Sequence, residues 1–387
     1  MNRIDPPQRS LLGPGPSDVA PSVLRALAAP TLGHLDPRTL DMMRELAEML
    51  RAIYDTKNPC TLAVSGTGTS GMETALVNLI EPGDRVLVAV HGYFGARLAE
   101  IAQRVGGDVT VVEQEWGKPS DPAKLRAAAA GRKFKVLAAV HAETSTGVKQ
   151  ELAPLSTVAE ELGALFVVDA VTSLGCTPVG VDRARIDAVY SCSQKGLSCT
   201  SGLSPVSFSP RAMEAIARRK QRVASFYLDI ALLERYWHGD HLYHHTACSN
   251  LFAALHEATR LVLEEGLEAR FARHACLSKA LVAGLEGLGL ELLIPAHERL
   301  PQVLAVKIPD GVDDLSVRKA LLEQYSIEIG GGLGALKGKV WRIGLMGSGA
   351  TPRNVLLAVS ALSSVLGPHG FRPRSEALAA AGAVLAS

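Results

Sequence analysis

The chain has 387 residues, of which 47% are apolar and 20% are charged, and its formal net charge is +1. This length exceeds what one ordinary hydrophobic core holds, so the sequence predicts two domains. The near-neutral charge excludes the basic surface typical of proteins that bind nucleic acid or anionic membranes. We therefore expect a soluble globular protein with neither nucleic acid nor a membrane as partner.

The cysteines and the N-terminus indicate the compartment. The six cysteines form no CxxC pair and no disulfide framework spacing, which is typical of reduced thiols. The N-terminal MNRIDPPQRS lacks the apolar core of a secretory signal, and no apolar run reaches the length of a membrane span. The sequence thus predicts a cytoplasmic protein.

Short apolar runs alternate with amphipathic helical patterns between residues 60 and 210. The runs are nearly continuous in Val, Ile, Leu and Ala, which predicts strands buried on both faces. Their alternation with helices predicts an α/β fold with a mostly parallel central sheet between helices. The predicted strands are 61–64, 85–90, 109–113, 135–141, 164–170, 186–191 and 204–209.

The pattern changes after the last of these strands. Residues 211–265 are helical but irregular, and a long helix is predicted over 266–290. Strands at 302–309 and 339–345 then alternate with helices at 314–324 and 352–366. This α+β pattern predicts a smaller C-terminal domain over 266–387. The Ala-rich tail after Pro368 is expected to pack weakly.

The stretch SGTGTSG (65–71) contains GxGxxG between a predicted strand and a predicted helix. A dinucleotide site would place an acidic residue at the end of the next strand, but the sequence there is HGYF (91–94). The hydroxyls of Thr67, Thr69 and Ser70, with the free N–H groups of a helix N-terminus, suit a monophosphate better. The alternative is a glycine turn with an ordinary helix cap.

Asp169 lies at the C-terminal end of one predicted strand, in FVVDA (166–170), and Lys195 follows the next predicted strand, in SCSQKG (191–196). In open α/β sheets, ligands bind outside the carboxyl ends of the strands. Taken alone, the aspartate could cap a turn and the lysine could face solvent. Together with a phosphate cradle they are typical of a pyridoxal phosphate site. The lysine forms an imine, the acid keeps the ring nitrogen protonated, and the helix N-terminus holds the phosphate.

Two further motifs have competing interpretations. HGDHLYHH (238–245) offers four histidines, but HxxH without a glutamate fails the zinc-protease pattern and no Cys/His spacing completes a site. We therefore expect no metal. Arg342, in the apolar run VWRIGL, either packs its stem at the rim of a sheet or clamps a substrate carboxylate, which its planar guanidinium suits.

Taken in order, the motifs resemble those of the class V aminotransferases, closest to the alanine–glyoxylate or serine–pyruvate branch. The resemblance extends from about Leu11 to about Gly367, through LLGPGPS, SGTGTSGMETAL, HAETSTGV, VVDAVTSLG, SCSQKG, SFYLD, YHHT, IGGGLG and VWRIGLMG. It implies a fold-type I pyridoxal phosphate enzyme that forms a homodimer with shared active sites. It also implies an N-terminal arm over the partner subunit (1–20) and a large cofactor-binding domain (21–265).

The resemblance implies a role for each site residue. Lys195 matches the Schiff-base lysine, Asp169 the acid on the pyridine nitrogen, and Arg342 the arginine that binds the substrate carboxylate. The other matches are to cofactor-binding positions: the phosphate cup at Thr67, Gly68 and Thr69, a phosphate neighbour at Gln194, the ring-hydroxyl contact at Thr144, the stacking aromatic at Phe94, and the two residues that reach the neighbouring subunit's phosphate, Tyr243 and Thr246. Thr69 and Phe94 depart from the family pattern, which often has His and Trp there.

The implied reaction moves an amino group from a small amino acid, alanine or serine, to a small 2-oxo acid, glyoxylate or pyruvate. Ureidoglycine–glyoxylate and 2-aminoethylphosphonate–pyruvate transaminases are the nearest alternatives. A cysteine desulfurase is disfavoured because the candidate cysteines fall inside predicted strands or helices rather than in a mobile loop. A dinucleotide-binding oxidoreductase lacks its ribose acid, and a non-catalytic relative is disfavoured because Lys195 and Asp169 are both present.

Overall fold

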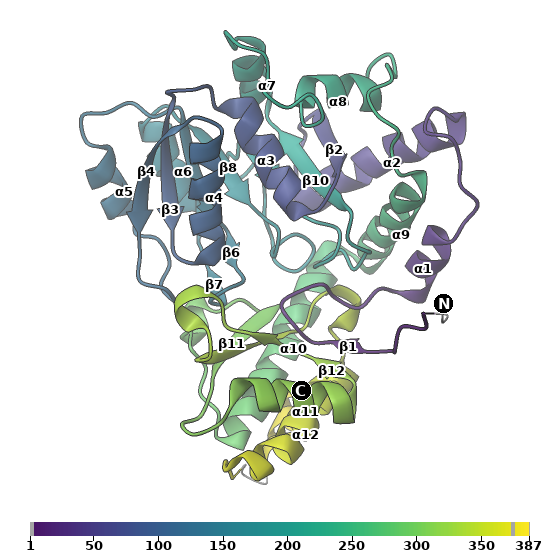
Figure 1. Cartoon of the computed structure of the whole chain (residues 1–387), viewed down its shortest axis with the longest axis vertical. Coiled ribbons are helices and arrows are strands. Elements are labelled where there is room, and N and C mark those ends of the chain that lie inside the picture. Colours follow the sequence, from purple (N-terminus) through teal and green to yellow (C-terminus); the bar gives the residue numbers. More distant parts are fainter. Residues whose placement is uncertain (1–3, 373–375, 387) are drawn as a thin grey trace.

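The computed structural model describes residues 4–372 and 376–386, and it has a large part and a smaller part below it (Figure 1). Most buried apolar side chains belong to one of two clusters. The first lies in the large part, between Val23 and Val262. The second lies in the smaller part, from Leu277 to Ala381, and includes Leu12 from near the N-terminus. The boundary expected after residue 265 falls between these clusters, and the domain division itself stays a prediction.

The large part is built around a seven-stranded sheet of order β2-β10-β9-β8-β5-β3-β4. Its strands are β2 (Cys60–Ser65), β3 (Arg85–Val90), β4 (Asp108–Glu113), β5 (Val136–Val140), β8 (Leu165–Asp169), β9 (Ala188–Tyr190) and β10 (Leu203–Phe208). Each lies within two residues of its predicted range. The pairs from β9 to β4 are parallel, which confirms the predicted α/β fold.

Two strands differ from the expectation of a parallel strand buried on both faces. β10 runs antiparallel to both β2 and β9. It follows β9 without a crossover helix, so the chain returns in the opposite direction. β4 forms an edge of the sheet, and its side chains are exposed or half-buried, with Val111 39% exposed. An apolar run therefore predicted the strand but not its place at the edge.

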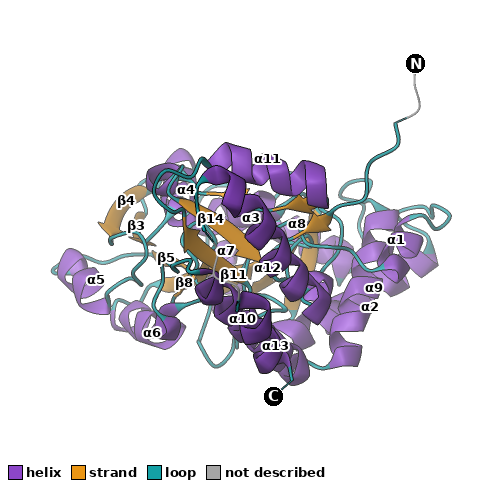
Figure 2. Cartoon of the chain, turned by 90° about the horizontal axis from the view of Figure 1, so that it is seen from below, coloured by secondary structure: helices purple, strands orange, loops and turns teal. Residues whose placement is uncertain are grey.

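Helices cover both faces of this sheet, with α3 and α4 on one side and α5 and α6 on the other (Figure 2). The helices of the large part are α1 (Pro21–Leu27), α2 (Pro37–Tyr54), α3 (Gly68–Leu79), α4 (Tyr93–Arg104), α5 (Pro122–Ala129), α6 (Leu152–Glu161), α7 (Pro210–Ala217), α8 (Ile230–Trp237) and α9 (Ser249–Glu265). Several start at a proline after an Asp or Ser whose side chain accepts a backbone N–H, as Asp36 does for α2. A short hairpin of β6 (Ala142–Glu143) and β7 (Val148–Lys149) follows β5.

The smaller part combines long helices with a three-stranded antiparallel sheet of order β11-β14-β13. Its elements are α10 (Leu267–Leu288), η1 (Ala296–Glu298), β11 (Val303–Lys307), α11 (Asp314–Tyr325), β12 (Ile327–Glu328), β13 (Gly330–Gly331), η2 (Gly334–Leu336), β14 (Val340–Gly344), η3 (Gly347–Gly349), α12 (Pro352–Leu366), η4 (Gly367–His369) and α13 (Ala377–Leu385). Near the N-terminus, β1 (Ser10–Leu11) pairs in parallel with β12 of the same chain. The expected contact of residues 1–20 with a second subunit stays a prediction.

The Ala-rich tail packs closely, so the expectation of weak packing is wrong for its described residues. α13 lies against α10 and α12, and Ala377 and Ala381 are buried. A Cβ added to Gly287 of α10 would lie 2.8 Å from the Ala377 Cα atom. Small residues on both helices therefore allow this close contact. Within the described ranges, no helix combines the length and the apolar character that crossing a membrane requires.

Candidate active site

A cavity of about 260 Å³ lies beyond the carboxyl ends of the parallel strands, and Leu333 and Arg342 of the smaller part also line it. β2, β5, β8 and β9 each end at this edge, so the loops after them contribute its walls, and β14 contributes Arg342 from the other side. Nine of the eleven predicted site residues line it: Thr67, Gly68, Thr69, Phe94, Thr144, Asp169, Gln194, Lys195 and Arg342. Tyr243 and Thr246 lie outside it.

Lys195 is buried in the loop after β9, with 7% of its surface exposed. Its Nζ atom donates to the Thr144 hydroxyl at 2.9 Å and to the Thr172 hydroxyl at 2.8 Å. The same atom lies 5.6 Å from the centroid of the Phe94 ring. Burial lowers the pKa of the Lys195 amine, because an apolar surrounding disfavours the ammonium form. A solvent-facing loop lysine is therefore excluded.

The N-terminal motif LLGPGPS (11–17) contacts Lys195 and its loop. The Ser17 hydroxyl donates to the Lys195 carbonyl at 2.7 Å, and the Ser17 N–H donates to the Gln194 carbonyl at 2.9 Å. Gly15 has a φ of 105°, and a Cβ added there would lie 2.8 Å from the Lys195 Cγ atom. Only glycine fits at this position without strain. The segment therefore packs directly on the Lys195 side chain and is hydrogen-bonded to its loop through Ser17.

Asp169 is the last residue of β8 and is 3% exposed. Its Oδ1 atom accepts the Val171 N–H at 2.8 Å, so the aspartate does shape the following turn. Burial raises the pKa of Asp169 to about 6, although the Val171 N–H and the Lys195 amine act in the opposite direction. A buried carboxyl facing a cavity is stabilised by a cationic N–H partner, which a protonated pyridine nitrogen would supply.

The start of α3 has the free groups that a phosphate needs. Thr67 is the N-cap residue, but its hydroxyl does not cap the helix. The first N–H groups of a helix have no acceptor within it, so they are free to bind an anion. The Ser70 hydroxyl, also expected to bind the phosphate, instead donates to the Thr67 carbonyl at 2.6 Å and is not free. Within the part of the chain that the structure describes, the hydroxyls of Thr67 and Thr69 make no hydrogen bond. The buried side-chain oxygen of Gln194 also lacks a partner there. These groups fit the phosphate end of pyridoxal phosphate.

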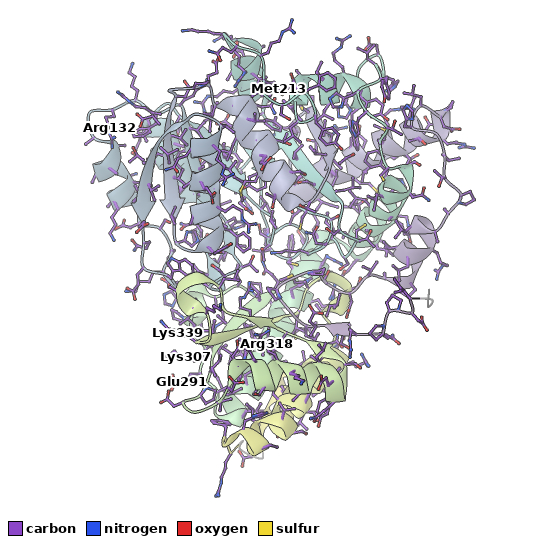
Figure 3. All side chains as sticks on the ribbon, viewed as in Figure 1. Arg132, Met213, Glu291, Lys307, Arg318 and Lys339 are labelled. Atoms are coloured by element: carbon purple, nitrogen blue, oxygen red, sulfur yellow. The ribbon has the colours of Figure 1, made fainter. Side chains whose placement is uncertain are left out.

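Arg342 reaches the cavity from β14 and is 7% exposed. Its Nε–H donates to the Gly331 carbonyl at 2.8 Å and its Nη1–H to the Thr144 carbonyl at 3.4 Å. Burial lowers the pKa of Arg342 to about 10, so the guanidinium stays charged at neutral pH. Arg318 of α11 (Figure 3) pairs with Asp314 and packs beside Gly331. The Arg342 guanidinium is thus held in a fixed orientation, and its remaining N–H groups can donate to a carboxylate.

Glu143, which the sequence analysis did not identify, fixes the aromatic wall of the cavity. Its carboxylate is fully buried and accepts the N–H groups of Phe94 and Gly95, each at 3.2 Å, and the Ser145 hydroxyl at 2.6 Å. It therefore caps α4 from the β6 strand and positions Phe94. The signal was present, because Glu143 lies two residues past the predicted strand 135–141, and Asp169 likewise lies at the carboxyl end of its predicted strand.

Arg97 is a second residue that sequence reasoning missed. It lines the cavity from α4, and its guanidinium carbon lies 5.1 Å from the Phe94 ring centroid and 5.3 Å from the Tyr93 ring centroid. Residues three and four positions apart share a helix face, so Arg97 packs on both rings. Arg97 thus places a cationic group against the Phe94 ring at the cavity wall.

Tyr243 and Thr246 lie on the surface rather than in the cavity. Tyr243 is 56% exposed, and its hydroxyl is 3.4 Å from that of Thr246. The histidines of the same stretch bond to backbone carbonyls, to one another or to Ser65. Among the residues the structure describes, no three His, Cys, Asp or Glu side chains are grouped to hold a metal.

A buried lysine and a buried aspartate at the carboxyl edge of a mostly parallel sheet, beside a free helix N-terminus, define the class of pyridoxal phosphate enzymes. Residues 22–346 match the family described as aminotransferase class-V. The chain is 40% identical to the alanine–glyoxylate aminotransferase of Drosophila melanogaster over 93% of each chain. It belongs to the class V aminotransferases, and pyridoxal phosphate is its cofactor.

Two solved structures are similar over nearly the whole chain. The alanine–glyoxylate aminotransferase of Nostoc sp. superposes with a TM-score of 0.93 at 47% identity, covering 95% of this chain and 97% of that one. The ureidoglycine–glyoxylate aminotransferase of Bacillus subtilis superposes with a TM-score of 0.97 at 41% identity, covering 100% of both. The predicted family and fold are thus confirmed, and the roles of individual site residues stay predictions.

Proposed function

We propose that this enzyme transfers the amino group of alanine or serine to glyoxylate or pyruvate. The observation that carries the proposal is the position of Arg342 and Lys195 on one cavity of about 260 Å³. Because this space holds the cofactor as well, it suits a substrate with one carboxylate and a short side chain. The alanine–glyoxylate aminotransferases among its relatives support the same substrate class.

Pyridoxal phosphate, when bound, supplies an aldehyde that bonds to amino groups and a pyridinium ring that accepts electrons. Arg342 binds the substrate carboxylate and so orients the Cα–H bond. Lys195 would hold the aldehyde carbon of the cofactor, and its Nζ atom would be the base that accepts the substrate Cα proton and the acid that returns it. Asp169 would keep the ring nitrogen protonated.

The remaining cavity residues hold the cofactor in our proposal. Thr67, Gly68 and Thr69 bind the phosphate at the start of α3, and Gln194 lies beside it. Phe94 stacks on the ring, and the hydroxyl of Thr144 contacts the ring oxygen. The smaller face of Phe94 and the missing histidine at Thr69 weaken individual contacts, but the free N–H groups of α3 are unaffected by either change.

Ureidoglycine–glyoxylate transamination is the second candidate, because the Bacillus subtilis structure of that name covers the whole chain with a TM-score of 0.97. A cysteine desulfurase remains disfavoured. Cys192 lies beyond the end of β9 rather than inside a predicted strand, but it is buried, and burial raises the pKa of its thiol to about 11.

We further propose a cytoplasmic homodimer in which Tyr243 and Thr246 complete the neighbouring site. Ring contacts join their stretch to two others, His34 to Tyr243 at 5.2 Å and His244 to Phe226 at 4.9 Å. Large apolar side chains are exposed around these contacts: Leu32, Leu35, Phe226, Tyr227 and Leu242. A second copy of the chain would cover them. All six cysteines are free, which agrees with a reducing compartment.

A panel of amino donors tests the proposed function. Purified holoenzyme is incubated with alanine, serine, ureidoglycine or 2-aminoethylphosphonate, each against glyoxylate and pyruvate, and the amino-acid product is quantified. We expect alanine or serine with glyoxylate to give the highest kcat/KM. A preference for ureidoglycine would select the second candidate, and no product from any pair would contradict transamination of this substrate class.

A further inference from the structure

Two buried threonine hydroxyls surround the Lys195 amine. Thr144 follows the β6 strand, and Thr172 follows β8 three residues after Asp169, so the two come from different loops. Nζ lies 2.9 Å from the Thr144 oxygen and 2.8 Å from the Thr172 oxygen, and the hydroxyls also contact each other. Both threonines are at most 2% exposed. Thr144 has an expected role near the cofactor ring, whereas Thr172 has none.

The two hydroxyl acceptors can fix the orientation of the Lys195 amine, because each takes one of its N–H groups. A neutral lysine amine has two N–H bonds and one lone pair. When both N–H groups donate to hydroxyl oxygens, rotation about the Cε–Nζ bond stops. The lone pair then occupies the tetrahedral position that points away from both threonines. A group that must accept a proton from one defined carbon benefits from this fixed direction.

Thr172 is itself held in place from the smaller part. Its backbone carbonyl accepts the Gln302 amide at 2.9 Å, and the Gln302 oxygen accepts the Thr177 hydroxyl at 3.0 Å. Gln302 is fully buried and directly precedes β11, which pairs with the β14 strand that carries Arg342. The same sheet thus anchors the proposed substrate arginine and the hydroxyl beside the lysine.

We propose that Thr172 is a positioning residue for Lys195, whose free amine its hydroxyl holds in line with the substrate Cα during proton transfer. The inference rests on the proposed transaminase function. In this step the Cα–H bond breaks, the lone pair of Nζ takes the proton, and the electron pair of the broken bond is accepted by the pyridinium ring that bound pyridoxal phosphate would supply. The ammonium so formed donates a proton back in the following step, which restores the neutral amine.

The first test measures the proton-transfer step itself. Holoenzyme in D2O exchanges the Cα hydrogen of its amino donor, and the exchange rate is followed by NMR. We expect Thr172→Val to slow exchange about 10- to 100-fold, with the donor's dissociation constant changed less than about threefold. Thr172→Ser keeps the hydroxyl and should stay within about threefold of wild type. Thr259→Val, a buried threonine of α9 far from the cavity, is the matched control.

The second test needs neither cofactor nor turnover. Acetylation of Lys195 in the cofactor-free protein is followed by mass spectrometry as a function of pH, which gives the apparent pKa of the amine. A hydroxyl acceptor favours the ammonium form, so Thr172→Val should lower this pKa by about one unit. Thr172→Ser and Thr259→Val should leave it unchanged.

The outcomes distinguish a failure of the proposed function from a failure of the proposed role of Thr172. A wild-type holoenzyme that exchanges no Cα hydrogen would overturn the proposed function itself. If wild type is active, an exchange rate in Thr172→Val within threefold of it would overturn only the role of Thr172. So would a Thr172→Ser variant as slow as Thr172→Val, since the side-chain shape rather than the hydroxyl would then matter. An unshifted pKa in Thr172→Val would equally contradict the hydroxyl–amine contact.

Discussion

Burial acts on the two ionisable residues at the centre of the cavity in opposite directions. It raises the pKa of Asp169 to about 6 and lowers that of Lys195, so both shifts favour the neutral forms. A neutral lysine amine is the form that attacks an aldehyde and accepts a proton. For Asp169, a cationic ring nitrogen would offset the cost of ionisation. The cavity therefore favours the neutral lysine, whereas at neutral pH, above the Asp169 pKa of about 6, it holds an ionised aspartate that a cationic ring nitrogen would stabilise.

Asp169→Asn tests the role of this carboxyl. With cofactor, we expect binding to persist but the transamination rate to fall about 100-fold, since an amide does not hold the ring nitrogen protonated. Unchanged kinetics would mean that the acid is only structural, through its bond to Val171.

The same variant is also predicted to change how the unfolding free energy of the cofactor-free protein depends on pH. In the folded chain Asp169 keeps its proton up to about pH 6, but in the unfolded chain only up to about pH 3.9. Folded wild type thus binds more protons in this interval, and its stability falls as pH rises from about 4 to 6, by about 3 kcal/mol. The unfolding free energy of Asp169→Asn minus that of wild type should therefore rise over the same interval. Denaturant titrations between pH 4 and 7 measure this difference in unfolding free energy. A difference that does not change with pH would contradict the raised pKa of Asp169.

Arg342→Lys separates substrate binding from cofactor binding. A lysine keeps the positive charge but loses the planar group that is held by Gly331 and Thr144. We expect KM for the amino donor to rise about 10- to 100-fold, while the dissociation constant of pyridoxal phosphate changes less than about threefold. The exposed Arg126→Lys is the matched control. If only cofactor affinity falls, the carboxylate is bound elsewhere.

The sequence predicted the residues at the strand ends but not their neighbours. Asp169 and Lys195 could be identified because they lie at or just beyond the carboxyl end of an apolar strand, where α/β sheets bind ligands. Thr172 and Arg97 could not, since their roles depend on contacts between loops and on one helix face, which no local pattern specifies. Glu143 obeys the same strand-end rule as Asp169 and could have been identified.

Among the elements, the N-terminal segment links the smaller part to the catalytic loop. β1 pairs with β12, and four residues later Gly15 packs on the Lys195 side chain. The motif LLGPGPS was recognised in the sequence, but its contact with Lys195 joins residues 180 positions apart in the chain. That contact appears only when the two parts of the fold come together.

Gly15→Ala is predicted to disturb the cofactor site through two separable effects. A positive φ costs any other residue about 1 kcal/mol or more, and the new methyl group would overlap the Lys195 side chain. Gly83→Ala is the matched control, because Gly83 has a φ of 86° with no atom within 4 Å of the added Cβ. Both variants should lose thermal stability, but only Gly15→Ala should lose cofactor affinity. Equal cofactor affinity in the two would contradict the role of this segment.

Strand positions followed from the apolar runs, whereas strand order and direction did not. The sequence of β10 predicts a buried strand, as those of its neighbours do, but the strand runs antiparallel to them. The apolar sequence of β4 predicts a buried strand, but β4 lies at the edge of the sheet. Apolar content indicates burial, and the neighbours of a strand depend on how the chain returns to the sheet. The tail helix α13 was missed for a related reason, because alanine and glycine contribute little hydrophobic signal even where they pack closely.

At the scale of the whole molecule, the account requires two chains for each active site. Complementation tests this requirement with two inactive variants, Lys195→Ala and the double variant Tyr243→Ala with Thr246→Ala. In a mixed dimer, one site would combine an intact Lys195 with an intact Tyr243 and Thr246 from the other chain. Mixing after mild dissociation should therefore restore activity to that site.

Two controls make the complementation interpretable. The double variant must be strongly impaired alone, and exchange of subunits must be demonstrated with tagged chains. If Tyr243 and Thr246 served their own chain's site, every site would keep one defect. A mixture no more active than its parents would then rule the shared site out.

The most direct measurement of the central claim is the 2-oxo acid released in a single half-reaction. Holoenzyme is mixed with alanine or serine in the absence of any acceptor, and the 2-oxo acid is quantified against the protein chain. The account predicts a burst of about one molecule per chain for wild type and almost none for Lys195→Ala, because a single amino group is transferred to each cofactor. No burst from wild type, or an equal burst from Lys195→Ala, would contradict a transaminase site centred on Lys195.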